Sequence, residues 1–205
     1  VCQGTTTANL TYSATVGFPD QYSIDYDAAA EAAGFVDVVN ASLPASPIVL
    51  TVPGAAAAGT YNAAVSVRNS STGLASGSYS ITITVSTPVD WANLQWPASG
   101  TICPSGTYTA YGRVYKAGVT PPAGAPVGIT AELGYSTTNS DPSTWTNWQP
   151  ATYNVQVGND DEFMSTLSGL LPGTYYYAFR YQSGACSYQY GGFAAVARAD
   201  QAVCA

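Results

Sequence analysis

The chain has 205 residues, of which 46% are hydrophobic and 12% aromatic, while only 8% are charged and the net charge is −7. This hydrophobic content is enough for packed cores, so the low charge does not indicate disorder. Five lysines and arginines cannot form a basic patch that neutralises phosphates, which excludes nucleic acid as a partner. No apolar run approaches the roughly 18 residues that cross a bilayer, so we expect no membrane span.

Strand-length segments that alternate apolar and polar side chains recur in the first half of the chain. They are Leu10–Thr15, Ile48–Val52, Tyr61–Arg68 and Tyr79–Ser86. A period of two with one polar face is typical of antiparallel sheets packed as a sandwich. Only Asp27–Gly34 predicts a helical turn, with Asp27 as its N-cap and Gly34 at its end.

The second half repeats this pattern after Thr87-Pro88-Val89-Asp90, where we place a module boundary. Its alternating segments are Ile129–Tyr135, Tyr153–Val157, Phe163–Leu167 and Thr174–Tyr181. In each half a Gly-Thr-Tyr triplet follows a Pro-Gly element and opens a long strand; the triplets end at Tyr61 and at Tyr175. A tyrosine in this position anchors a corner in many sandwich domains. The sequence predicts an all-β fold of two tandem immunoglobulin-like antiparallel β-sandwich domains, residues 1–87 and 88–205.

Four cysteines, an even number, occur in a chain without histidine: Cys2, Cys103, Cys186 and Cys204. Without histidine or a Cys-x-x-Cys pair a structural zinc site is not expected, and the even count favours disulfides in an oxidising compartment. We favour Cys103 with Cys186, both in the second module, which leaves Cys2 and Cys204. Together with the uncharged polar surface, this predicts an extracellular or cell-surface protein, and the start at Val1 is typical of a mature or excised product.

Two sets of sequence stretches resemble known surface modules. In the first half they are VCQGTTTANLTYSAT, QYSIDYDAAAEAAGFVDV, LPASPIVLTVP and AAAAGTYNAAVSVRN. On these, residues 1–86 resemble the immunoglobulin-like (PKD-like) repeats of large surface proteins from Bacteroidetes-type bacteria. In the second half they are WANLQWPASGTI, YGRVYKAGVT, GITAELGYSTTNSDPSTWTNWQPATYN, GNDDEF and PGTYYYAFRY, on which residues 90–193 are similar to a β-sandwich module of secreted bacterial proteins. The resemblance implies secretion, a sandwich fold and no catalytic activity.

The resemblance also implies a disulfide for which this chain lacks one of the two cysteines. In the first family a cysteine usually follows the long strand, in a turn that reads Ala-Thr-Gly-Cys, and pairs with the cysteine near the start. Here Leu74 stands in place of that cysteine, so Cys2 would lose its usual partner. Cys2 and Cys204 then either pair within one chain or link one copy to the next in a head-to-tail filament.

Candidate catalytic and metal sites are few. The absence of histidine excludes Ser-His-Asp and Cys-His catalysis, and carboxylates adjacent in sequence do not form the opposed pair of a glycosidase. We therefore expect no enzyme activity and no cofactor. The loop Gly158–Glu162 offers Asp160, Asp161 and Glu162 as a weak Ca²⁺ candidate. The favoured interpretation is a polar hairpin turn without metal, because no full calcium-loop spacing is present.

Aromatic side chains are the remaining candidates for a binding site. Trp145, Trp148 and Tyr135 lie in a stretch that could stack on sugar rings, and Trp91 with Trp96 is a second pair. Core or inter-module packing explains the same tryptophans, because each carries a large apolar area. A third set, Tyr176, Tyr188 and Tyr190, is a candidate for a subunit interface.

The leading functional hypothesis is an extracellular structural protein, a subunit or repeat of a bacterial surface fibre, adhesin or filament. It would self-associate into a homopolymer through β-sandwich contacts, head-to-tail in one version, and its low charge limits repulsion between copies. Residues 194–205 would either close the second module or add to a neighbour's sheet edge. The alternative function is a non-catalytic carbohydrate-binding module of a secreted multidomain protein, with a polysaccharide as its partner.

Overall fold

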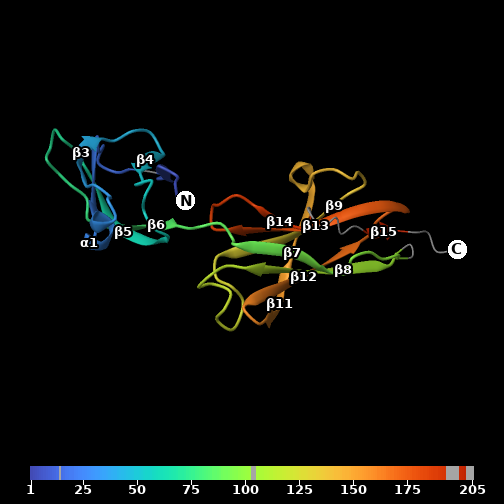
Figure 1. Ribbon diagram of the computed structural model, residues 1–205. Helices are drawn as coiled ribbons and strands as arrows, with labels where there is room; N and C mark the ends of the chain where they lie inside the picture. The colour runs from blue at the N-terminus through green and yellow to red at the C-terminus, as the bar shows by residue number, and fades with distance from the viewer. Residues whose placement is uncertain (14, 103–104, 193–198, 202–205) are drawn as a thin grey trace. The chain divides into compact units, whose positions relative to one another are not determined.

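The computed structural model describes residues 1–13, 15–102, 105–192 and 199–201, which form strands β1 to β15, one short α-helix and one 3-10 turn. The chain divides into two compact units, Val1–Thr87 and Pro88–Ala205 (Figure 1). The strands pair antiparallel in every sheet, and the two units follow each other along the chain. The predicted all-β fold of tandem immunoglobulin-like sandwiches is confirmed.

The first unit packs a four-stranded sheet against a two-stranded one. The larger sheet has the order β3 (Val38–Ser42), β2 (Gln21–Tyr26), β5 (Gly59–Arg68) and β6 (Tyr79–Val85). The smaller sheet pairs β1 (Thr7–Leu10) with β4 (Ile48–Thr51). A parallel bridge between Cys2 and Ser86 attaches the first residues of the chain beyond the end of β6.

The core of the first unit lies between these two sheets and contains the apolar side chains of the alternating segments. The rings of Tyr26 and Tyr61 lie 5.0 and 4.8 Å from that of Phe35, centroid to centroid. Ile24 from β2 and Leu50 from β4 are buried in the same cluster. Phe35 therefore links the large sheet to the loop that follows the helix.

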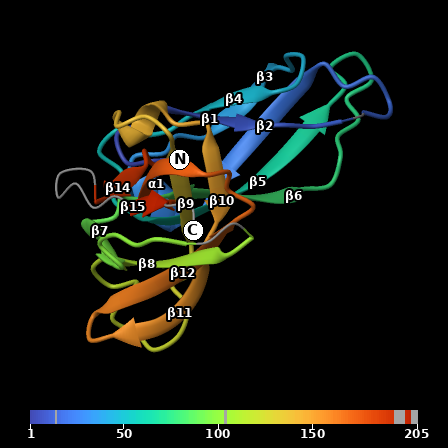
Figure 2. The same cartoon turned by 90° about the vertical axis from the view of Figure 1, so that its right-hand side faces the viewer.

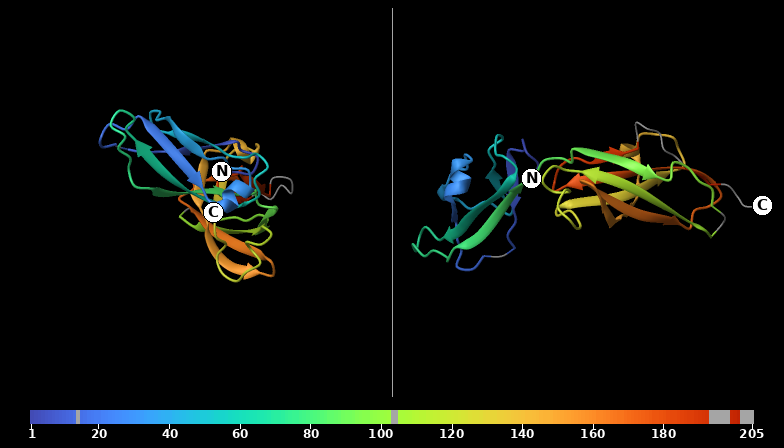
Figure 3. Two further views of the ribbon diagram at one scale, coloured as in Figure 1. Left: turned by 90° about the vertical axis from the view of Figure 1, so that its left-hand side faces the viewer. Right: turned by 60° about the horizontal axis from the view of Figure 1, so that its bottom comes forward.

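The predicted helical turn is confirmed as α1 (Ala28–Ala32), which lies beside β5 (Figure 3). The Asp27 carboxylate accepts a hydrogen bond from the Ala30 amide at 2.8 Å, so Asp27 is its N-cap. Gly34 has a φ of 95°, a left-handed conformation that favours glycine at the end of a helix.

The second unit contains a four-stranded sheet and a five-stranded sheet. One has the order β11 (Thr152–Val157), β12 (Asp160–Ser168), β8 (Thr107–Tyr115) and β7 (Trp91–Trp96), and Figure 2 shows its members β8, β12 and β11 next to one another. The other has β10 (Asn147–Pro150), β9 (Ile129–Ser136), β13 (Gly173–Ser183) and β14 (Gln189–Gly191), while β15 (Ala199–Gln201) also pairs with β13 and the 3-10 turn η1 (Pro142–Thr144) precedes β10. The order β11-β12-β8-β7 matches the D-E-B-A sheet of constant-type immunoglobulin domains, and β10 is an additional strand beside β9, β13 and β14, which match C, F and G.

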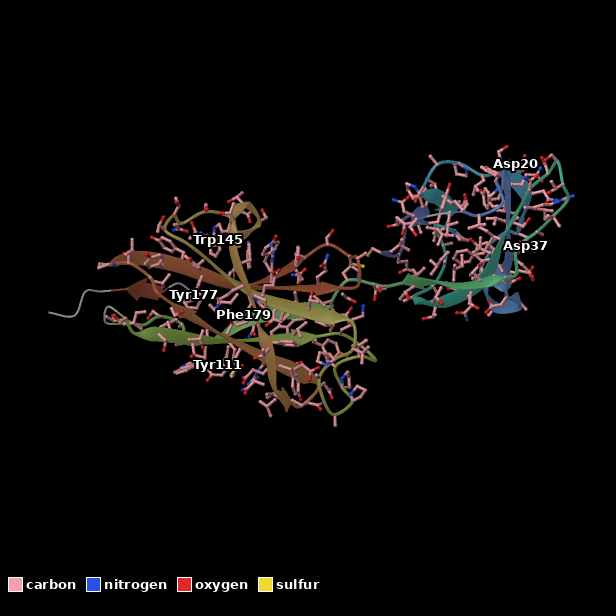
Figure 4. The ribbon with its side chains drawn as sticks, turned by 180° about the vertical axis from the view of Figure 1, so that it is seen from behind. Asp20, Asp37, Tyr111, Trp145, Tyr177 and Phe179 are labelled. Carbon is pink, nitrogen blue, oxygen red and sulfur yellow. The ribbon has the colours of Figure 1, made fainter. Side chains whose placement is uncertain are left out.

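Strand β13 supplies the centre of the second core. Tyr177, Phe179 and Tyr181 are all almost completely buried, and Figure 4 shows Tyr177 and Phe179 inside the unit. They pack with apolar side chains of the opposite sheet, among them Val114 and Phe163. The alternation predicted from the sequence thus places one face of β13 in the core.

One predicted strand is shorter than expected, because the alternating segment Leu10–Thr15 ends as β1 at Leu10. Beyond it, the Tyr12 amide donates to the Ser46 hydroxyl at 3.0 Å and the Tyr12 hydroxyl donates to the Pro44 carbonyl. These bonds to a loop replace the ladder that a strand would need. Of the predicted C-terminal strand, residues 194–198 and 202–205 lie outside the described residues. Neither helical segment of the described chain has the length and apolar character needed to cross a membrane.

Candidate functional site

Trp148 lies on the outer face of the sheet formed by β10, β9, β13 and β14. Trp148 is opposite Gly134 of β9. Leu133, the residue before Gly134, is buried and faces the core. A Cβ atom at position 134 would lie 2.5 Å from the Trp148 ring, so the indole lies directly over the glycine backbone. Side chains alternate between the faces of a strand, which places the ring on the side away from the core.

Four further side chains join Trp148 in what we call the Trp148 cluster: Trp145, Arg180, Tyr188 and Tyr190. The rings of Trp145 and Trp148 stack at 6.0 Å, and Trp148 contacts Tyr190 at 5.9 Å. The Arg180 guanidinium lies 4.1 Å from the ring centroid of Trp148 and 4.0 Å from that of Tyr188. Pairing of Arg180 with Glu132 and Tyr190 in the sheet register brings these strands together.

The polar groups of the Trp148 cluster have their partners within the chain. Arg180 forms an ion pair with Glu132 at 2.6 Å. The indole N–H of Trp148 donates to the Trp145 carbonyl at 2.9 Å, and that of Trp145 donates to the Ser140 hydroxyl at 3.0 Å. A cation held against two aromatic rings stabilises this face by cation–π attraction, so the cluster is built primarily for packing.

Tyr135 does not belong to this surface, which corrects its grouping with Trp145 and Trp148 as a sugar-stacking set. It lies on the core side of β9, packs against the core cluster and makes an edge contact with Tyr175 at 5.9 Å. The reason is the strand period, because Tyr135 follows Leu133 by two residues and shares its face. The third candidate set also divides: Tyr188 and Tyr190 join the Trp148 cluster, while Tyr176 is half-buried opposite Ser136.

The second tryptophan pair lies on the outer face of the other sheet, where we define the β7–β8 strip as Trp91, Trp96, Tyr111 and Tyr115. Trp91 is opposite Tyr115, and Trp96 is opposite Tyr111 with ring centroids 5.8 Å apart. Trp96 is 60% exposed and Trp91 43% exposed. In Figure 4, Tyr111 and Trp145 lie on opposite outer sides of the unit, so this strip is separate from the Trp148 cluster.

Hydrogen-bonding side chains lie between the two aromatic pairs of the strip. Arg113 donates from Nε to the Gln95 side-chain oxygen at 2.8 Å and lies 3.8 Å from the Glu162 carboxylate. The Asn93 side-chain oxygen accepts from the Arg113 amide at 3.1 Å, and Asn154 donates to Glu162 at 2.6 Å. The polar groups are therefore fixed in position beside exposed rings. Sequence analysis missed Tyr111, Tyr115 and Arg113, although they alternate along a single segment.

The Ca²⁺ candidate does not converge on one point. Gly158 and Asn159 form the turn, and β12 begins at Asp160. Asp161 pairs with the core residue Val114 and faces the interior, whereas Glu162 pairs with Arg113 on the outer face. Within the described ranges, no group of three or more acidic or cysteine side chains is arranged to hold a metal ion.

Asp161 is instead a buried carboxyl group. It has no exposed surface, and neither of its side-chain oxygens has a hydrogen-bond partner among the residues that the structure describes. Burial raises the pKa of Asp161 to about 6, and the negative charge of Asp160 acts in the same direction. An isolated carboxyl in a β-sandwich core provides no second group for acid–base catalysis.

Cys2 and Cys186 each take part in a disulfide. Cys103 and Cys204 lie outside the described residues, so the pairing of the four cysteines stays a prediction. Positions 2 and 74 lie far apart in this fold. Cys2 lies beside Ser86, after β6, while Leu74 precedes β6. A seven-residue strand spans about 23 Å, far beyond the roughly 7 Å between the Cα atoms of a disulfide.

Comparison with known proteins gives no family assignment. No family model matches the chain, and no curated protein matches it. Among solved structures, it is similar to a chimeric titin Z1Z2 functionalized with an exogenous decorin peptide and to titin domains Z1Z2 in complex with telethonin. Each has 14% identity, a TM-score of 0.28 and full coverage of this chain, with 91% and 90% of the other chain covered.

A third solved structure is Dpr2 Ig1-Ig2 in complex with DIP-Theta Ig1-Ig3, with 11% identity and a TM-score of 0.30 over 98% of this chain and 60% of that one. TM-scores this low carry no argument about function. The fold assignment rests on the strand pairing described above.

Proposed function

We propose that this chain is a non-catalytic structural or adhesive part of an extracellular bacterial surface protein, and that it acts by self-association through its sheet surfaces. The observation that carries the proposal is the β7–β8 strip, which exposes two tryptophans on one outer sheet face. Exposed aromatic side chains grouped on one face are typical of interaction surfaces.

The charge distribution supports this proposal. The strip surrounds one arginine that is near a glutamate, so its centre carries little net charge. Depletion of net charge at the centre of a contact and enrichment in aromatic residues and arginine are common to protein interfaces. Extracellular location rests on the disulfides and on the resemblance of both halves to surface modules.

Sedimentation velocity and negative-stain electron microscopy of the full chain test the proposal. We expect concentration-dependent oligomers or fibres, and we expect the double variant Trp91→Ser/Trp96→Ser to reduce them. Val127→Ser is the matched control, because Val127 is 90% exposed in the same unit but lies outside the strip. A chain that stays monomeric at all concentrations would contradict self-association.

Polysaccharide binding is the second candidate function, and the position of Trp96 favours it. An exposed indole can stack on the apolar face of a sugar ring, and Asn93, Gln95 and Arg113, which hydrogen bonds hold together on the same sheet, can supply polar groups for its hydroxyls. Trp148 is less suited, because its ring already contacts Trp145 and Arg180.

A pull-down with insoluble neutral polysaccharides tests this second function. We expect the parent chain to be retained and Trp96→Ala to lose retention, while Trp148→Ala keeps it in the folded fraction. The absence of retention by the parent chain across such polysaccharides would remove this candidate.

A further inference from the structure

Strand β4 of the first unit has a free edge. It pairs with β1 on one side and with no described strand on the other. In the second unit the corresponding strand β12, which also precedes the long strand with the corner tyrosine, is flanked by both β8 and β11. Among the described residues, the first unit therefore has no counterpart of β11, and its smaller sheet has two short strands.

The backbone groups on this edge can be assigned from the register. The Val52 amide donates to the Thr6 carbonyl at 2.9 Å, and Ala8 is opposite Leu50. Because hydrogen-bonded pairs alternate along an antiparallel ladder, the N–H and C=O groups of Val49 and Thr51 point away from β1. Within the described part of the chain, these groups have no hydrogen-bond partner.

An apolar groove of about 310 Å³ runs along the same edge. Its floor contains Ile24, Tyr26 and Phe35 from the core, and its rim contains the exposed Val36 and Val49. The groove gives access to core side chains that a third strand would cover.

This edge lacks the features that usually protect one. Native edge strands carry charges, prolines or bulges that prevent pairing with another chain. The sequence Ile48-Val49-Leu50-Thr51 has no charge, and Pro47 and Pro53 only mark its ends. The nearest acidic group of the groove, Asp37, accepts a hydrogen bond from the Tyr26 amide at 2.8 Å.

We propose that two copies of this chain pair through their β4 strands, antiparallel about a two-fold axis, and so join their smaller sheets into one. Free N–H and C=O groups in strand geometry recognise another extended peptide backbone. The edge is self-complementary, because an axis through Leu50 places Val49 of each copy opposite Thr51 of the other, and these are the residues whose backbone groups point outward. Both copies present an uncharged strand, so their net negative charges do not meet at the contact.

This pairing deepens the proposed self-association by naming one contact. A two-fold contact in the first unit closes on itself as a dimer. Together with a separate contact through the β7–β8 strip of the second unit, it would generate an open chain of subunits. A four-residue strand buries little area, so the isolated dimer is expected to be weak and to form at high protein concentration.

Charge substitution at the two outward positions tests the register in the full chain. Val49→Lys/Thr51→Lys places lysines opposite each other in both pairs and should raise the dimer dissociation constant about tenfold. Val49→Lys/Thr51→Glu places opposite charges in both pairs and should keep the dimer. Both positions are exposed and face away from the core, so both variants should fold. Leu74→Lys, an exposed site elsewhere in the unit, is the control.

Mixing provides the decisive measurement. The double-lysine variant and Val49→Glu/Thr51→Glu should each dimerise about tenfold more weakly than the parent chain when alone and should form a heterodimer when mixed, as measured by sedimentation velocity. If repulsion between the net charges of two copies controlled dimerisation, the double-lysine variant would dimerise more strongly than the parent chain, because two lysines bring the net charge of −7 closer to zero. Amide hydrogen exchange at Val49 and Thr51 should also slow as the concentration of the parent chain rises.

The outcomes separate this inference from the proposed function. Oligomers that the double-lysine variant retains unchanged would overturn the β4 pairing and leave self-association through the strip in place. A parent chain without any oligomer would overturn both. Loss of the dimer in the double-lysine variant without recovery on mixing would also overturn the proposed register.

Discussion

The hydroxyl of Tyr61 donates a hydrogen bond to the carbonyl oxygen of Ala57, four residues earlier in the chain, at 2.8 Å. Tyr175 and Leu171 form the same bond in the second unit at 3.0 Å. Both tyrosine rings are buried at the start of the long strand of their unit. The corner tyrosine predicted from the repeated Gly-Thr-Tyr is therefore confirmed in both units, and each fixes the loop that enters the strand.

Removing this hydroxyl should destabilise each unit by a similar amount. Tyr175→Phe and Tyr61→Phe each keep the ring but leave a carbonyl without its donor, so we expect a loss of about 1 kcal/mol in the free energy of unfolding. Urea denaturation measures it. Tyr79→Phe is the control, because Tyr79 is 64% exposed, and it should change little. Equal stability of Tyr175→Phe and the parent chain would show that the corner bond contributes nothing.

The buried Asp161 makes stability depend on pH. Its folded-state pKa of about 6 lies above the unfolded value near 3.8, so the unfolded state releases this proton more readily. The contribution of Asp161 to stability is therefore greatest below about pH 4 and falls as pH rises through 6. Asp161→Asn should raise the melting temperature at pH 8 and leave it nearly unchanged at pH 4.

The comparison between variant and parent isolates this group. Other carboxyls act in the opposite direction; for example, hydrogen bonds from Ser70 lower the pKa of Asp20. Asp25→Asn is the matched control, since Asp25 is exposed on a strand of the other unit and should change the melting temperature little at either pH. A melting temperature of Asp161→Asn that differs from the parent equally at pH 4 and pH 8 would contradict burial of an ionised carboxylate.

Gly112 of β8 is required by the packing of β13. A Cβ atom at this position would lie 2.7 Å from the ring of Phe179 and closer still to the Tyr181 hydroxyl, and both rings are fully buried. Gly112→Ala should therefore cost about 1–3 kcal/mol through overpacking. Gly77→Ala, where nothing lies within 4 Å, should be neutral or slightly stabilising in the same denaturation experiment.

Arg180 should contribute more to stability than Arg113. Arg180 has a short ion pair and two aromatic rings around its guanidinium, whereas the ion pair of Arg113 is 3.8 Å long. We expect Arg180→Ala to cost about 2 kcal/mol and Arg113→Ala less than about 1 kcal/mol. Thermal unfolding of the two variants checks the order, and the reverse order would contradict the packing role of the Trp148 cluster.

Alternation along single strands was predictable, and the pairing of distant strands was not. The period of two placed Tyr175, Tyr177, Phe179 and Tyr181 on one face of β13, and all four are buried. The same period places Tyr135 beside Leu133, so it already argued against a shared surface for Tyr135 and Trp148. That surface was predicted because Tyr135 and Trp148 are close in sequence, without regard to the face of the sheet on which each side chain lies.

The partners of Trp148 depend on strand order, which the residues themselves do not specify. Arg180 and Tyr190 reach Trp148 because their strands β13 and β14 follow β10 and β9 in the same sheet. A local signal did exist: Arg180 is one of only five cationic residues and occupies the outer face of a strand rich in tyrosine. The free edge of β4 was likewise hidden, because an alternating segment predicts a strand but not its neighbours.

The attachment of the first residues to β6 determines how the first unit resists tension. The Gln3 amide donates to the Ser86 carbonyl at 2.7 Å, and the Ser86 amide donates to the Val1 carbonyl at 2.9 Å. These segments run parallel, so a pull applied to the backbone at Val1 and at Thr87 slides one along the other. Both bonds then carry the load together in shear instead of opening in turn, a loading geometry suited to a link in a chain that is stretched between two anchored surfaces.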